Sequence, residues 1–294
     1  MARRRGRPVD GWLIVDKPEG IGSTGVVGRA RRAFDAEKAG HAGTLDPLAT
    51  GLLAIAFGEA TKTVPYAQEG EKTYRFTARW GEATTTDDRE GPVSATSPRR
   101  PSREEIEAAL PAFTGRIMQR PPAFSAIKVE GARAYDLARG GEAPELAARP
   151  IDVIRLTLRA MPDEDHAEFE MVCGKGGYVR AMARDLGERL GTCAHVTALR
   201  RVASGGFTLE GATALAELEP GLSETRLLPV AAGLSGLPHL EVSALAASRI
   251  RMGEAAAAPP GPATVFWAAH EGAPVAVLET AGGAVRIRRV FRHG

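Results

Sequence analysis

The carboxylate of Asp46 stands in a sequence setting suited to chemistry. It lies between a glycine-containing approach and Pro47, and an apolar run, residues 52–57, follows. This run is bounded by glycines and is too short for an ordinary helix, so it indicates a buried strand. We therefore expect Asp46 in a short loop that feeds a core strand, which is a stiff mount for a charged group. The alternative is that Asp46 only initiates a turn, as Asp before Pro often does.

The chemistry open to this carboxylate is narrowed by the motifs that the sequence lacks. It holds no Walker loop, GxGxxG fingerprint, HExxH pair or Gly-x-Ser-x-Gly elbow, and Cys173 and Cys193 lack metal-ligand spacing. One mounted carboxylate, a few aromatic residues and scattered arginines fit a reaction on a nucleobase. We expect such a reaction to use no cofactor and no metal.

Composition places the chain among ordinary soluble globular proteins. Its 294 residues are 44% hydrophobic and 25% charged, which suits one large domain and a smaller one. No apolar run approaches membrane-spanning length, and the basic N-terminus lacks the apolar core of a secretory signal, so we expect a cytoplasmic protein. A net charge of +2 is too small to argue nucleic-acid binding by itself.

Apolar periodicity predicts the elements that must position these residues. A strand is expected at residues 12–15, and then a helix capped by Ser23 or Thr24, whose exposed face carries arginines. Alternation over residues 74–80 indicates a half-buried strand. Further expected elements are a short helix at 59–68, a helix opened by a capping box at 102–105, a strand pair at 151–160 and 166–173, a helix at 179–190, and three short strands between 264 and 290.

Several segments carry a resemblance to a known family. The run at residues 43–53 resembles the catalytic loop of tRNA pseudouridine-55 synthases of the TruB type. Other segments similar to those of the family occur in the family's order, at residues 12–18, 58–62, 72–76, 121–128, 176–180 and 198–201. The resemblance spans residues 11–202 and is weak beyond them.

The resemblance implies an α+β fold with a mixed, mostly antiparallel sheet and the active site in a cleft across it. It implies a catalytic domain over residues 11–235 after a basic arm at 1–10, with an RNA-clamping insertion at 123–149. The C-terminal residues 239–294, which are β-rich by pattern, occupy the position of the family's PUA-like RNA-binding module.

The resemblance also implies the roles of three catalytic residues. Asp46 is the catalytic carboxylate, either as a nucleophile or as a base, and both roles require it ionised. Because burial would raise its pKa, a neighbouring guanidinium is needed, and Arg180 is the expected partner. Tyr74 is expected to stack on the flipped uracil.

The expected substrate-binding residues have more varied roles. His41 is expected to fill the gap in the RNA stack, and Tyr178 and Leu199 to form the pocket wall. Lys17 is expected to support the strands or to meet phosphate, and Asp88 to join the electrostatic network. Lys62 and Lys128 are expected to contact the RNA backbone. Asp87 stands beside Asp88 and competes for its assignment. The chain has Gly177 where the family often carries Thr.

The implied activity is the isomerisation of uridine 55 in the T loop of tRNA to pseudouridine. We expect the T arm of tRNA as the partner and a monomer that needs no other protein. Two rivals stay open: an RNA chaperone whose isomerase activity is secondary or lost, and an enzyme of the same chemistry that depends on guide RNA and partner proteins. The short basic arm favours a stand-alone enzyme, since guide-dependent relatives usually carry longer basic extensions.

Overall fold

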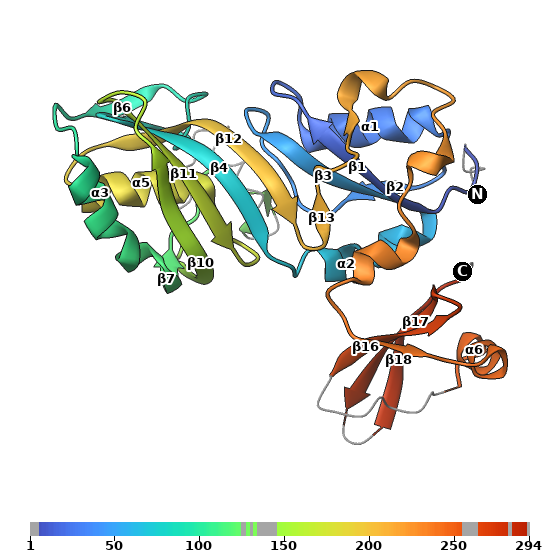
Figure 1. The fold of residues 1–294 in the computed structure, drawn as a ribbon. Coiled ribbons are helices and arrows are strands. Elements are labelled where there is room, and N and C mark those ends of the chain that lie inside the picture. Colours follow the sequence, from blue (N-terminus) through green and yellow to red (C-terminus); the bar gives the residue numbers. More distant parts are fainter. Residues whose placement is uncertain are drawn as a thin grey trace. The chain divides into compact units, whose positions relative to one another are not determined.

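The computed structural model describes residues 6–124, 128–129, 132–133, 146–254, 264–281 and 284–292. Most of the expected arm at 1–10 and of the insertion at 123–149 lies outside them. The chain forms two compact units (Figure 1), the first made of Met1–Pro47, Gly51–Gly70 and Ala203–Gly294 and the second of Leu48–Thr50 and Glu71–Val202. The range 11–235, which we expected to be one domain, is thus shared between the units, and 239–294 belongs to the first.

The first unit is built on a pair of apolar strands. Strand β1 (Gly11–Lys17) runs antiparallel to β3 (Thr50–Phe57), with Gly11 opposite Phe57 and Lys17 opposite Gly51. Residues 51–57 are buried throughout, as their apolar run predicts. On the other side, β1 pairs in parallel with β14 (Thr213–Ala214). The remaining elements around the pair are α1 (Ser23–Ala33), β2 (Ala39–His41), η1 (Gly58–Lys62), α2 (Val64–Ala67), β13 (Phe207–Thr208), η3 (Leu215–Glu217), η4 (Glu224–Arg226) and η5 (Val230–Leu234).

The C-terminal part of the first unit is a small four-stranded sheet. Its strand order is β15 (His239–Glu241), β16 (Val265–His270), β17 (Ala273–Ala281) and β18 (Ala284–Val290), with β15 and β16 parallel and the other pairs antiparallel. Helix α6 (Ala244–Arg251), which was not expected from the sequence, buries Ala247 and Ile250 against this sheet. The β-rich character expected for residues 239–294 is confirmed.

The second unit contains an antiparallel part of the main sheet. Its strands follow the order β12 (Ala194–Ser204), β4 (Lys72–Trp80), β11 (His166–Cys173), β10 (Arg149–Ala160) and β7 (Gly115–Gln119). The pairs β4–β11, β10–β11 and β7–β10 are antiparallel, as is β1–β3, whereas β1–β14 is parallel. The expected α+β fold with a mixed, mostly antiparallel sheet is therefore confirmed. The smaller elements are β5 (Glu82–Thr84), β6 (Val93–Thr96), α3 (Arg103–Ala109), η2 (Leu110–Phe113), β8 (Lys128–Val129), β9 (Ala132–Arg133) and α5 (Val179–Arg189).

Local chemistry explains where the helices of the second unit begin. The capping box predicted for α3 is present: Ser102 Oγ accepts from the Glu105 amide at 3.2 Å, and Glu105 Oε2 accepts from the Ser102 amide at 2.9 Å. Helix α5 starts after Tyr178 and packs against β4. Among the described residues, the helices are all too short or too polar to cross a membrane.

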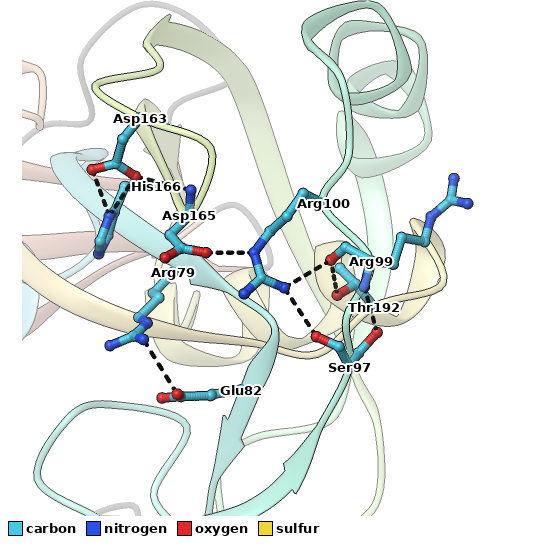
Figure 2. A network of polar contacts seen from close by, with 9 residues as sticks. All are labelled: Arg79, Glu82, Ser97, Arg99, Arg100, Asp163, Asp165, His166 and Thr192. Atoms are coloured by element: carbon cyan, nitrogen blue, oxygen red, sulfur yellow. Dashed lines mark hydrogen bonds and ion pairs between the residues drawn. The ribbon is translucent and has the colours of Figure 1, made fainter.

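A polar network holds one end of the second unit together (Figure 2). Arg100 pairs with Asp165 in the β10–β11 turn and donates to the Ser97 carbonyl at 2.9 Å. The hydroxyl of Thr192 donates to the Arg99 carbonyl at 2.9 Å, and Arg99 donates to the Leu190 carbonyl at 2.7 Å. The network therefore anchors the C-terminal end of α5, the helix whose first turn carries Arg180.

Candidate active site

The loop of Asp46 is clamped on both sides of the carboxylate. The Ser23 hydroxyl accepts from the Leu45 amide at 2.8 Å and donates to the Leu45 carbonyl at 2.9 Å. The Pro47 carbonyl accepts from Lys17 Nζ at 3.2 Å and from the Gly20 amide at 2.9 Å. Asp46 itself is partly exposed between these fixed neighbours. The stiff mount expected from the sequence is confirmed.

The role of Ser23 differs from our expectation. We expected Ser23 or Thr24 to cap α1, but the N-cap is Gly22 and no side chain bonds there. Ser23 is buried and uses its hydroxyl for the Asp46 loop instead. The sequence pattern of a cap could not reveal this use, because the partner lies 22 residues away.

Lys17 also supports the loop of Asp46. Its side chain is fully buried, and Nζ also donates to the carbonyls of Pro18 at 2.9 Å and Ile21 at 2.7 Å. Of the two roles weighed for Lys17, this position favours support of the loop over contact with phosphate.

His41 and Lys62 complete the expected residues of the first unit. His41 ends β2 opposite Ile55 of β3 and is partly exposed. The ammonium of Lys62 donates to Glu59 at 2.6 Å and to the Val290 carbonyl at 2.9 Å. It also lies 5.9 Å from the centre of the Phe291 ring. Because these contacts join η1 to the end of the C-terminal sheet, we leave Lys62 out of the RNA contacts proposed below.

Arg180 is a buried cation of the second unit, with 4% of its surface exposed. Its Nη1 donates to the Thr86 carbonyl at 3.0 Å and its Nη2 to the Phe124 carbonyl at 2.8 Å. Nη1 also lies 3.5 Å from Asp88 Oδ2. The structure therefore brings together Arg180 and Asp88, two of the residues that the sequence singled out.

The structure also separates the parts played by the two adjacent acids. Asp88 Oδ1 accepts from the Thr86 hydroxyl at 2.6 Å and from the Glu90 amide at 3.0 Å, which leaves Oδ2 toward Arg180. Asp87 has a positive φ of 60° and directs its carboxylate to Arg184, 2.8 Å away. Asp88, rather than Asp87, is thus the acid beside Arg180.

Two further polar residues of this region were missed from the sequence. Arg184 lies four residues after Arg180 on α5, so the two side chains share a face of the helix. The adjacent acids Asp87 and Asp88 were the signal in the sequence that two basic partners are needed. Gln119 is 1% exposed and bonds the Tyr178 backbone twice, accepting from its amide at 2.8 Å and donating to its carbonyl at 3.1 Å. No local pattern marks Gln119, because the contact spans 59 residues.

The glycine before Tyr178 has a steric cause. A Cβ at Gly177 would lie 2.8 Å from Cys173 Sγ and 3.4 Å from its Cβ. Cys173 is completely buried, so its thiol has little room to move aside. Gly177 is thus matched to Cys173.

The remaining expected residues lie on strands of the second unit. Tyr74 is partly exposed on β4 opposite Met171, and Leu199 is buried on β12 with its carbonyl 3.4 Å from the Thr50 hydroxyl. Lys128 belongs to β8, but its side chain lies outside what the structure describes. Asp46, His41 and Lys17 belong to the first unit, and Tyr74, Asp88, Tyr178, Arg180 and Leu199 to the second.

Solved structures share this fold. A chain from "Crystal Structure of a Cbf5-Nop10-Gar1 Complex" matches with a TM-score of 0.74 at 23% identity, over 95% of this chain and 84% of that one. A chain from "Structure of H/ACA RNP bound to a substrate RNA containing 2'-deoxyuridine" matches with a TM-score of 0.75 at 22% identity, over 99% and 91%.

Family profiles and relatives define the class and then the family. Residues 31–179 match the N-terminal domain of TruB family pseudouridylate synthases, and residues 180–228 match the tRNA pseudouridylate synthase B C-terminal domain. The protein is therefore a pseudouridine synthase, an isomerase. It belongs to the TruB family, in agreement with the resemblance seen in its sequence.

Relatives extend the match over the full length. The chain is 54% identical to "tRNA pseudouridine synthase B" of Cereibacter sphaeroides, over 98% of each chain. It is 52% identical to the protein of that name from Dinoroseobacter shibae, over 99% of this chain and 98% of the relative. With that of Paracoccus denitrificans the identity is 51% over 100% of both chains.

Proposed function

We propose that this protein converts the uridine at position 55 in the T loop of tRNA to pseudouridine, with Asp46 as the catalytic carboxylate. The observation that carries this proposal is the loop clamp: Ser23 fixes Leu45, and Lys17 and Gly20 fix Pro47, on either side of Asp46. Relatives about half identical to this chain and named for tRNA pseudouridine synthesis support the choice of substrate.

The reaction needs a positioned anion and no external reactant. The C1′–N1 bond of the uridine breaks, the freed uracil turns, and C5 bonds to C1′. C5 then loses its proton, and N1 gains one. A carboxylate contributes either by attacking the sugar or by removing a sugar proton, and in both cases it must be ionised. We assign this role to Asp46.

Arg180 is proposed to keep Asp46 ionised and directed at the sugar. An opposite charge nearby lowers a carboxyl pKa, which offsets the effect of a water-poor site. Two carbonyls and Asp88 already orient the Arg180 guanidinium, so it supplies a fixed positive field rather than a mobile one. This preorganisation favours Arg180 as the catalytic partner.

The target base has to leave its stack before it can react. Extruding a base costs a few kcal/mol, and stacking on an aromatic side chain returns about 1–3 kcal/mol. We assign the stacking to Tyr74, the pocket wall to Tyr178 and Leu199, and the filling of the vacated stack to His41. Contacts with phosphates of the T arm supply the remainder.

The test replaces Asp46 by Asn, which keeps the shape of the side chain and removes its charge. We expect Asp46→Asn to bind an unmodified tRNA transcript with wild-type affinity and to form no pseudouridine. Asp35→Asn is the matched control, because Asp35 is an exposed acid with a positive φ of 47° that Asn also tolerates. Normal pseudouridine formation by Asp46→Asn would refute the assignment.

A second experiment addresses the substrate and the need for partners. The purified chain alone is incubated with a tRNA transcript, with the same transcript carrying cytidine at position 55, and with an isolated T-arm hairpin. We expect modification of the first and third and none of the second. Absence of turnover without added RNA or protein would favour the guide-dependent alternative.

A further inference from the structure

Two adjacent acids face two arginines that lie one helical turn apart. Arg180 and Arg184 share a face of α5, and each takes one acid: Arg180 Nη1 lies 3.5 Å from Asp88 Oδ2, and Arg184 Nη1 lies 2.8 Å from Asp87 Oδ2. The proposed function uses only the first pair. The second pair is closer but more exposed, with side chains 14% and 15% exposed against 5% and 3% in the first.

Asp87 lies within electrostatic reach of both arginines. Burial raises the pKa of its carboxyl, and the positive charges of Arg184 and then Arg180 oppose that rise. Its backbone cannot carry the carboxylate away, because the Asp87 amide donates to the Thr84 carbonyl at 3.3 Å and its carbonyl accepts from the Val196 amide at 3.1 Å. Only rotation of the side chain can change which arginine Asp87 faces.

Arg184 is fixed independently of Asp87. Its Nη2 donates to the Arg120 carbonyl at 2.7 Å, and its Nε donates to Asp185 Oδ1 at 2.9 Å. The guanidinium is therefore held at a defined place beside Asp87 by contacts that do not involve Asp87.

We propose that Arg184 is a positioning residue that holds the Asp87 carboxylate away from Arg180. Arg180 is the other cation whose charge acts on the Asp87 carboxyl, so without Arg184 the carboxylate would turn to Arg180 and compete with the catalytic one. The inference rests on the proposed pairing of Arg180 with Asp46. It adds Arg184 to the residues on which the rate depends, although Arg184 does not touch the reacting atoms.

The test is whether removing the Asp87 carboxylate restores the activity that is lost when Arg184 is replaced. Rates on a tRNA transcript are measured for Arg184→Met, Asp87→Asn and the double variant. We expect Arg184→Met to lower kcat roughly ten- to hundredfold with KM changed less than about twofold, since it misdirects a catalytic group. Asp87→Asn keeps the left-handed backbone and should stay within about threefold of wild type, and the double variant should return to that level.

If the Arg184–Asp87 pair only stabilises the fold, the three variants should have different relative kcat values. In that case Asp87→Asn would lose as much kcat as Arg184→Met, and the double variant would be no better than either. Either result, or wild-type kcat in Arg184→Met, would overturn the inference. Should Arg184→Met fail to fold, Arg184→Gln replaces it in both single and double variants, with the same outcomes.

Three controls separate this inference from the proposed function. Asp185→Asn removes the other acid from Arg184 and should leave kcat near wild type, and Arg184→Lys should retain most of it. Arg180→Met should be inactive. If Arg180→Met keeps full activity, the proposed pairing with Asp46 is wrong; if it is inactive but the double variant is not rescued, only the role of Arg184 is refuted.

Discussion

At the scale of single residues, the most informative contact is between Gly177, which has no side chain, and the buried thiol of Cys173. Gly177 precedes Tyr178, the N-cap of α5, and the space that a Cβ at Gly177 would occupy is taken by Cys173. The requirement for glycine here comes from packing and not from backbone conformation. Changes at these two positions should therefore depend on each other.

Gly177→Thr is expected to lower the free energy of unfolding by about 1–3 kcal/mol, the usual cost of overpacking a buried site. Cys173→Ala removes the clashing sulfur, so the double variant should recover most of this loss. Chemical denaturation of the two single variants and the double variant measures the coupling. Additive effects would show that the two positions do not share the space.

Cys173 also predicts a pH dependence of stability. Burial raises the pKa of its thiol to about 11 from an ordinary 9.0, against the opposing charge of Lys72. A raised pKa means that the neutral thiol stabilises the fold below pH 9, and that this stability is lost as the pH rises toward 11. We expect the free energy of unfolding to fall by about 2–3 kcal/mol across that window.

The control for this prediction is the other cysteine. Cys173→Ala should remove this part of the alkaline decline, and Cys193→Ala should keep it. An equal decline in both variants would mean that other groups account for it.

At the scale of elements, the Asp46 loop depends on the end of β1. Lys17 is the last residue of this strand, and its ammonium donates to the carbonyls of Pro18, Ile21 and Pro47. A hydrogen bond to a charged group contributes about 1.5–3 kcal/mol. The strand end, the turn that follows and the catalytic loop are thus joined through one side chain.

Lys17→Met preserves length and removes the ammonium. We expect it to lower the free energy of unfolding by at least about 2 kcal/mol and to lower kcat, because the loop beside Asp46 loses its fixed partner. Denaturation and single-turnover rates measure the two effects. Lys38→Met, at an exposed lysine, should change stability by less than about 0.5 kcal/mol. Wild-type kcat in folded Lys17→Met would show that the loop needs no such support.

At the scale of the whole molecule, the C-terminal sheet is joined to the rest of the first unit by a small apolar cluster. Phe291 is completely buried and packs with Leu234 of η5, Trp267 and Val277. Beside it, Lys62 donates to the Val290 carbonyl, and Glu59 accepts from the Arg292 amide at 2.8 Å. These contacts hold the end of β18 on η1 and η5.

Phe291→Ala should open this junction. Removing a buried aromatic side chain costs about 3–5 kcal/mol, so we expect the C-terminal residues to become sensitive to proteolysis while the second unit stays protected. Limited proteolysis with mass spectrometry identifies the cleaved segment. Val93→Ala, at an exposed apolar residue, is the control. Unchanged protection of residues 239–294 in Phe291→Ala would contradict the role of the junction.

Local patterns in the sequence determined much of this protein. The apolar run of β3, the alternation of β4, the capping box of α3 and the spacing around Asp46 all depend on neighbours in the chain, so each could be predicted from residue types. The family motifs marked Asp88 and Arg180 for the same reason, and the structure brings these two together.

Tertiary structure alone decided which distant groups meet. Ser23 bonds the Leu45 backbone rather than capping its own helix, and Gln119 bonds the Tyr178 backbone. Lys62 bonds the Val290 carbonyl at the end of the C-terminal sheet. The choice between Asp87 and Asp88 also depended on a positive φ and on two arginines nearly a hundred residues away. Such pairings follow from the packing of strands and helices far apart in sequence, and a local pattern carries no signal for them.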